Sequence, residues 1–381
     1  AWPMWRNTHP EKSSGWYRHR DVGIMNEKSM KNNAPLWKRL LSESIATLDA
    51  LPRLPSTHRE KLERVISRYP MRINPYYLGL IKEENDPIYR QCMPDVRELD
   101  DKGALADPLN EEGHSPVYGL THRYPDRVLF LVSSQCAMYC RFCNRKRKVG
   151  RTSMVTDASI EQGIGYIRAH KEVRDVLLSG GDPLLLEDAR LREILSAIRA
   201  IGHVEIIRIG TRVPCTLPQR VTPELTMLLQ KFHPLHINIH FNHSLEITSE
   251  ASLACNRLAD AGIPLGCQTV LLKGVNDDLA TIMTLTRKLL TIRVKPYYLF
   301  HADPARGTSH FRTSLNRGLS IIRGLQGHTS GLCVPHFAID LMGGGGKVPL
   351  LPEYLTGQGG DSLLVTNYAG ERYRHPDGDD D

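Results

Sequence analysis

Residues 127–143 read RVLFLVSSQCAMYCRFC, an apolar run that ends in a group of cysteines. The Val, Leu and Phe residues of its first half predict a buried strand. Cys136, Cys140 and Cys143 follow with C-x3-C-x2-C spacing, so one loop carries three thiols shortly after that strand. Thiolates spaced so closely along the chain can surround one metal centre. The stretch therefore predicts a strand whose carboxyl end carries a metal site.

Similar apolar runs recur along the chain, and longer amphipathic stretches separate them. The expected strands are residues 127–132, 175–178, 204–209, 236–240, 266–272, 295–300 and 333–339, and the expected helices lie near 157–170, 187–200, 222–231, 247–262, 277–291 and 314–325. This alternation is typical of βαβ units with a parallel sheet. It predicts an α/β fold, a partial (β/α)6-type TIM barrel, with a doubly wound open sheet as the alternative.

The segments outside this repeat divide the chain into three expected regions. Residues 1–119 form an N-terminal arm, helices over 36–70 and a connecting segment rich in Asp, Glu, Pro and Gly over 84–119. Residues 120–350 form the barrel, and residues 351–381 form a C-terminal tail. Apolar positions at helical spacing support the first helices, and the turn-forming residues support the connecting segment.

The composition predicts a protein without a membrane span or a secretory signal. The 381 residues carry a formal net charge of +7, and no apolar run has the length of a membrane helix or the position of a secretory signal. A disulfide framework is therefore not expected. The five cysteines outside the cluster stand singly among apolar residues, which predicts buried thiols: Cys92, Cys215, Cys255, Cys267 and Cys333.

A dense basic run follows the cysteines at Arg145, Lys146, Arg147, Lys148 and Arg151. Alone, it allows a nucleic-acid patch or, more often, a solvated loop. Its place beside a possible metal site adds a third interpretation, a role of the run at that site.

Zinc and an iron–sulfur cluster are the alternatives for the three thiols. Structural zinc takes four ligands, and neither a second cysteine pair nor a nearby histidine completes the set. A four-iron cluster held by three cysteines leaves one iron open to S-adenosylmethionine (SAM). The spacing after a strand resembles the radical SAM superfamily. That resemblance implies that Phe142 packs near the adenine, and that Ser179, Gly180, Gly181 and Asp182 contact SAM; without it, the last four would predict only a tight turn.

Four glycines precede Lys347 at positions 343–346. A phosphate-binding P-loop does not fit, because Leu341 stands where its first glycine belongs and Val348 follows the lysine. A lysine on a glycine hinge suits covalent attachment of pyridoxal phosphate (PLP), since it must move away when substrate arrives. A solvated surface lysine is the alternative.

Several stretches together resemble the lysine 2,3-aminomutase family over roughly residues 70–360. They are LTHRYPDR at 120–127, LSGGD at 178–182, HFNH at 240–243, KPYY at 295–298, HFRT at 310–313, GHTSG at 327–331 and GGGGK at 343–347. The resemblance implies a radical SAM, PLP-dependent isomerase that holds a [4Fe-4S] cluster on its three clustered cysteines and PLP on Lys347. It places Arg123, Tyr124 and Arg127 at PLP, His240 among the cofactor residues, and Arg145 on the substrate carboxylate.

Two acids bear on the substrate. Asp303 and Asp340 fall where lysine-type members of the family bind the distal ammonium, which predicts L-lysine as substrate and β-lysine as product. Arginine and ornithine satisfy the same acids and stay open, and His301, Ala302 and Pro304 depart from the lysine type. A non-catalytic iron–sulfur or nucleic-acid-binding module leaves Lys347 unexplained.

The expected partners follow from the chemistry. They are a small amino acid, a low-potential electron donor such as flavodoxin or ferredoxin, and a second copy of the chain in a homo-oligomer, with neither nucleic acid nor membrane. Some family members bind structural zinc through a cysteine-rich tail. No cysteine follows Cys333 here, so this zinc site is not expected.

Overall fold

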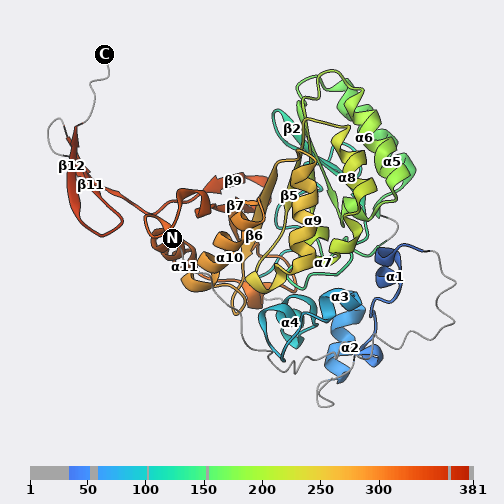
Figure 1. The fold of residues 1–381 in the computed structure, drawn as a ribbon, viewed down its shortest axis with the longest axis horizontal. Coiled ribbons are helices and arrows are strands. Elements are labelled where there is room, and N and C mark those ends of the chain that lie inside the picture. The colour runs from blue at the N-terminus through green and yellow to red at the C-terminus, as the bar shows by residue number, and fades with distance from the viewer. Residues whose placement is uncertain (1–33, 52–58, 101–102, 152–153, 359–361, 377–381) are drawn as a thin grey trace, which may run out of the picture.

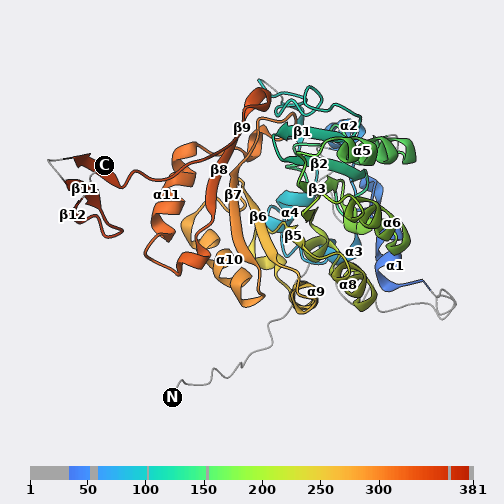
Figure 2. The same ribbon diagram turned by 90° about the horizontal axis from the view of Figure 1, so that it is seen from above.

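A computed structural model describes residues 34–51, 59–100, 103–151, 154–358 and 362–376. Its main sheet has nine strands in chain order, and Figure 2 shows this sheet curling into an arc. Seven central strands are parallel, and the edge strands β1 and β9 run antiparallel to their neighbours. The strands are β1 Leu120–Tyr124, β2 Arg127–Ser133, β3 Asp175–Gly180, β4 Ile206–Thr211, β5 Leu235–Ile239, β6 Leu265–Leu271, β7 Lys295–His301, β8 His336–Leu341 and β9 Gly346–Pro349.

Helices cover the outer, convex side of the arc (Figures 1 and 2). They are α5 Asp157–Ala169, α6 Asp188–Arg199, α8 Pro223–Gln230, α9 Ser249–Asp260, α10 Leu279–Thr291 and α11 Leu315–Leu325, with the short α7 Val213–Thr216 after β4. Side chains of Thr156, Thr248 and Asp278 accept backbone N–H groups at the starts of α5, α9 and α10, as good N-caps do. The predicted partial barrel is confirmed, including its seven parallel strands and six covering helices.

The pleat of each strand separates a cavity face from a packed face. In β6, Gly266, Gln268 and Val270 line the interior of the arc, and the residues between them are buried. Alternating residues of a strand point to opposite faces. The outer face packs against the helices in a core that runs from the N-terminal region to α10. The five singly placed cysteines are all buried, as predicted.

The N-terminal region lies against the loops that follow β2, β4 and β5 (Figure 1). It contains α1 Leu36–Ser42, η2 Leu48–Ala50, α2 Arg59–Arg68, α3 Pro75–Leu78, α4 Pro87–Cys92 and η4 Val96–Leu99. The segment expected as a plain connection over 84–119 thus includes two helical turns. At the other end of the chain, β10 Leu355–Gln358, β11 Ser362–Thr366 and β12 Arg372–Pro376 form a separate three-stranded sheet. The sequence did not predict these strands, and the domain boundaries remain predictions.

The arc is open between β1 and β9, where side chains replace sheet pairing. The Tyr124 hydroxyl accepts the Lys347 N–H at 2.8 Å. The side-chain amide of Asn110 donates to the Gly343 carbonyl, and the Gly343 N–H donates to Pro108. No helix in the described part of the chain is long and apolar enough to cross a membrane.

Candidate active site

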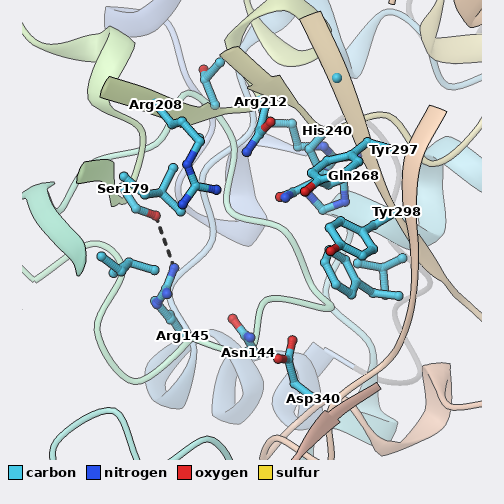
Figure 3. Close-up of a pocket in the computed structure, with 18 of the residues that line it drawn as sticks. Asn144, Arg145, Ser179, Arg208, Arg212, His240, Gln268, Tyr297, Tyr298 and Asp340 are labelled. Atoms are coloured by element: carbon cyan, nitrogen blue, oxygen red, sulfur yellow. Dashed lines mark hydrogen bonds between the residues drawn. The ribbon is translucent and has the colours of Figure 1, made fainter. Parts of the chain in front are cut away.

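A cavity of about 1260 Å³ lies inside the arc. Figure 3 shows part of its lining, with side chains from several strands and the cysteine loop turned toward one space. Every residue that the sequence singled out for the site lines this cavity. They are Arg123, Tyr124, Arg127, Cys136, Cys140, Phe142, Cys143, Arg145, Ser179, Gly180, Gly181, Asp182, His240, Asp303, Asp340 and Lys347. The parallel strands explain this convergence, because their carboxyl ends meet at one edge of the sheet.

The cysteine loop fits an iron–sulfur cluster by its donors. Burial raises the pKa of the Cys143 thiol to about 11 and also raises that of Cys136, and the neighbouring cysteines add to both shifts. Buried thiols of this kind ionise when a metal centre supplies positive charge. Within the described residues, no three His, Cys, Asp or Glu side chains converge as a single metal ion requires. A four-iron cluster binds each thiolate on a separate iron, so its cysteines need not converge on one point.

Buried charges anchor this loop to the N-terminal region. Arg141, between the second and third cysteines, donates from Nε to Glu98 Oε1 at 2.8 Å, and Lys146 Nζ donates to Glu98 Oε2 at 2.7 Å. The Glu98 side chain is fully buried, and the two cations are nearly so. Burial disfavours the Glu98 carboxylate, but the two cations outweigh it and lower its pKa. Glu98 was not predicted as part of the site, because nothing local in the sequence connects it to residues more than forty positions away.

The glycines after β3 allow two backbones to approach closely. Gly180 has φ 131°, and a Cβ there would lie 2.1 Å from the Ser133 carbonyl oxygen. A Cβ at Gly181 would lie 2.4 Å from the Gln135 carbonyl oxygen. Asp182 N–H donates to that same Gln135 carbonyl at 2.7 Å. These glycines were predicted to let the backbone approach a ligand, and the close approach in the structure is to the start of the cysteine loop.

Asp182 and Arg212 connect β3 and β4 to the cysteines. The Asp182 carboxylate accepts from the Thr211 hydroxyl and the Arg212 N–H, both at 2.7 Å. These hydrogen bonds favour the charged carboxylate, but burial outweighs them and raises the pKa of Asp182 to about 6. The Arg212 guanidinium donates from Nη1 to Cys140 Sγ at 2.8 Å and from Nη2 to Glu246 Oε1 at 2.6 Å. Arg212 was also missed by the sequence analysis.

An aromatic group completes this side of the cavity. The Phe142 ring lies 5.6 Å from the ring of His240 and 5.1 Å from the Arg212 guanidinium. Burial, and then the charge of Arg212, lower the pKa of His240 to about 3, so its ring is neutral at pH 7. The buried Nε of Arg212 has no hydrogen-bond partner among the described residues. A buried donor without a partner beside an apolar ring suits a ligand with both polar and flat apolar parts.

Lys347 lies directly opposite Asp340 in the β8–β9 pair. Its Nζ is 3.3 Å from Asp340 Oδ2 and 4.4 Å from the centre of the Phe300 ring. Three of the four preceding glycines have positive φ: Gly343, Gly344 and Gly346. Glycine adopts such angles without strain. The run therefore makes a turn that returns the lysine to the cavity, and the sequence had suggested only a flexible hinge.

The residues proposed for PLP lie around that lysine. Tyr124 bonds the backbone of Lys347, and the Arg127 guanidinium lies 4.0 Å from the centre of the Tyr124 ring. Arg123 has a buried Nε that lacks a hydrogen-bond partner among the described residues. Arginines are suited to bind phosphate. The lysine, the rings and the free donor fit PLP.

Arg145 is engaged by an acid that the sequence analysis did not identify. Its Nε and Nη2 lie 2.8 and 2.6 Å from Glu111 Oε1, and its Nη1 donates to Ser179 Oγ at 3.3 Å (Figure 3). Burial opposes ionisation of Glu111, but Arg145 and its basic neighbours outweigh it and lower the pKa to about 2. Glu111 thus fixes one edge of the guanidinium beside the cavity.

The same acidic segment explains most of the basic run. Arg147 Nη2 lies 2.8 Å from Asp107 Oδ1, and Lys148 Nζ lies 3.5 Å from Glu112 Oε1. Lys146 is paired with Glu98, and Arg145 with Glu111. These four cations face carboxylates of the same chain, which disfavours the interpretation as a nucleic-acid patch.

Asp303 follows β7 and faces the cysteine loop. The Asn144 side-chain amide donates to Asp303 Oδ2 at 2.7 Å. Burial raises the pKa of Asp303 to about 6, and Asp340 adds to the rise. Asp303 and Asp340 both line the cavity, as two acids that share one ammonium must.

Comparisons with known proteins identify the class that this fold and site define. The model of the Radical SAM superfamily matches residues 130–285, and the Lysine-2,3-aminomutase model matches residues 322–380. An L-lysine 2,3-aminomutase of Methanococcus maripaludis is 49% identical over 358 residues, covering 90% of this chain and 83% of that protein. The one from Clostridium subterminale is 48% identical, covering 88% and 82%. A glutamate 2,3-aminomutase of Clostridioides difficile is 42% identical, covering 96% and 88%. The chain belongs to the lysine 2,3-aminomutase family.

Proposed function

We propose that this chain is an isomerase that moves the amino group of L-lysine from carbon 2 to carbon 3 and forms β-lysine. The observation that carries the proposal is the shared cavity. The cysteine loop, Lys347, Arg145 and the two acids line one space inside one barrel. The relatives named L-lysine 2,3-aminomutase, at 48–49% identity, support the same substrate.

The residues have separate tasks in this proposal. Bound SAM and the cluster supply the radical chemistry that removes a hydrogen atom, and bound PLP supplies the conjugated ring. Lys347 would hold PLP through its Nζ. Arg145, fixed by Glu111, binds the substrate carboxylate as a charge-assisted pair.

Asp303 and Asp340 favour lysine over glutamate. Two carboxylates attract a distal ammonium and repel a distal carboxylate, and at about 4 Å in a partly buried site such a contact is worth about 4 kcal/mol in either direction. Arginine and ornithine carry the same charge as lysine. They are therefore the competing substrates that the assay must include.

The assay is anaerobic turnover of the reconstituted enzyme with SAM, PLP and a strong reductant. Lysine, arginine, ornithine and glutamate are offered separately, and products are compared with β-amino acid standards by mass spectrometry. We expect conversion of lysine alone. Turnover of arginine in its place would overturn the substrate, and cleavage of SAM without any product would overturn the aminomutase.

A variant separates PLP attachment from turnover. We expect Lys347→Ala to lose the PLP absorbance band that survives desalting, whereas Lys288→Ala, an exposed lysine on α10, keeps it. An unchanged band in Lys347→Ala would contradict the assignment. We further propose a low-potential protein reductant, a homo-oligomer and a cytoplasmic location, since an open iron site is sensitive to oxygen.

A further inference from the structure

Asn144 stands between two residues that already have a part in the proposed site. Cys143 precedes it as a cluster ligand, and Arg145 follows it as the carboxylate-binding residue. Neither role uses Asn144. Its side chain lines the cavity, and its Nδ2 lies 2.7 Å from Asp303 Oδ2, across 159 residues of sequence.

An amide is a distinctive partner for this carboxylate. An ionised carboxylate has about four acceptor positions, so one amide donor leaves capacity for a cationic ligand. A lysine or arginine at position 144 would neutralise Asp303, and an apolar residue would leave its oxygen without this donor. Asn144 therefore orients Asp303 and favours its charged form without cancelling the charge.

The charges around Asp303 make this bond important. Burial and Asp340 disfavour its charged form, whereas Asn144, Lys347 and Arg145 favour it. In the proposed function Lys347 would hold PLP and Arg145 would bind the substrate carboxylate, so both cations would have partners other than Asp303. The Asn144 amide has no such second task in the reaction.

Adjacent side chains of one loop thus reach two ends of the cavity lining. Arg145 extends to Glu111 and to Ser179 in β3, whereas Asn144 extends to Asp303 beyond β7. Figure 3 shows Asn144 and Arg145 diverging from their common stretch of loop. The spacing between the site for the carboxylate and the site for the distal cation is therefore set by two consecutive residues.

We propose that Asn144 is a specificity-determining positioning residue that holds Asp303 where it receives the distal cation of the substrate. The inference rests on the proposed function, because it takes a cationic amino acid as the ligand. Asn144 acts through Asp303, so its loss weakens binding of the distal end more than it slows the chemistry.

The test measures KM and kcat for lysine, arginine and ornithine in the reconstituted wild-type enzyme, Asn144→Leu and Asn144→Ala. The first variant removes the donor at similar volume, and the second removes it with a smaller side chain. We expect KM for lysine to rise about tenfold or more in each, with kcat changed less than about threefold and the preference among the three substrates altered. Asn316→Leu, at an exposed position on α11, is the matched control.

Two further measurements distinguish a role of Asn144 in holding the cluster loop from its proposed role in positioning Asp303. Iron and sulfide content, with the cluster's electron paramagnetic resonance signal, reports whether the loop still holds its cluster. If Asn144→Leu loses the cluster, Asn144→Ala decides the matter by the same KM criterion. Unchanged KM in a variant with an intact cluster would overturn the inference, whereas absence of lysine turnover in the wild type would overturn the proposed function itself.

Discussion

The loop of residues 134–150 carries the cysteines, and the turn of residues 342–347 carries the lysine, at the same cavity. The loop is held by a buried charge cluster at Glu98 and by backbone hydrogen bonds to Arg72 and Gln91. The lysine turn, by contrast, is half exposed and rich in glycines with positive φ. It is held across the gap between β1 and β9 by the Tyr124 hydroxyl and the segment around Asn110. The proposed reaction requires a cluster that is held in place and a lysine that can move. The contacts that hold the cysteine loop and those that hold the lysine turn differ in this sense.

The largest expected effect lies in the cysteine loop. Cys143→Ser removes one of the three proposed cluster ligands, so we expect the reconstituted protein to lose its iron and all turnover. Iron analysis and the absorbance of the cluster test this. Cys333→Ser, at a buried cysteine far along the chain, is the control and should keep both. A full iron content in Cys143→Ser would remove this residue from the cluster.

The anchor of that loop comes next. Glu98→Gln leaves Arg141 and Lys146 buried without their counter-charge, which we expect to lower the free energy of unfolding by about 3–5 kcal/mol. Urea denaturation of the cofactor-free protein measures it. Glu112→Gln alters an acid whose side chain is 64% exposed, and such pairs contribute about 1 kcal/mol or less. Equal losses of unfolding free energy in both variants would contradict the expected difference between a buried and an exposed ion pair.

Acid pH should weaken the binding of a cationic substrate. Because burial raises the pKa of Asp303 to about 6, its carboxylate is charged above that pH and gains a proton below it. We expect kcat/KM for lysine to fall about tenfold per pH unit below pH 6. Burial raises the pKa of Asp182 to about 6 as well. Asp303→Asn distinguishes the two acids. The fall of kcat/KM below pH 6 should disappear in this variant if protonation of Asp303 causes it, and should remain if protonation of Asp182 does.

The smallest expected effect concerns the lysine turn. Tyr124→Phe removes one hydrogen bond to the Lys347 backbone, worth about 1 kcal/mol. We expect PLP to bind about fivefold more weakly, with the cluster content unchanged. Titration of the cofactor-free protein with PLP measures it, and Tyr118→Phe, at an exposed tyrosine, is the control. A loss of iron in Tyr124→Phe would show that the contacts of the lysine turn and those of the cysteine loop are not independent.

Local pattern was enough to predict most of the barrel. Apolar runs and amphipathic spacing located the seven parallel strands and their six helices, because burial on a strand or helix face leaves a periodic trace. The edge strand β1 reads LTHRY and is only partly buried after its first residue, so it carries little of that trace. The short β9 and the strands of the C-terminal sheet were missed for the same reason.

The site divides in the same way. The cysteine spacing predicted a metal site, and the family resemblance proposed Lys347, Asp303 and Asp340 for the site; the structure brings all of them to one cavity. Glu98, Glu111 and Arg212 were missed, because each acts through a partner distant in sequence. A charged residue carries no local sign of its buried partner, and here the partners come together only after the barrel forms.

The gap between β1 and β9 has a consequence for the order in which parts of the chain fold. Every strand from β2 to β9 pairs with the strand before it in the chain, so the sheet can grow one unit at a time during synthesis. The bond from Lys347 to Tyr124, in contrast, spans 223 residues. Closing so long a segment costs more chain entropy than pairing neighbours. We therefore expect the cysteine loop to find its place early in biosynthesis and the cofactor lysine to arrive last, so that the cluster site matures before PLP can be retained.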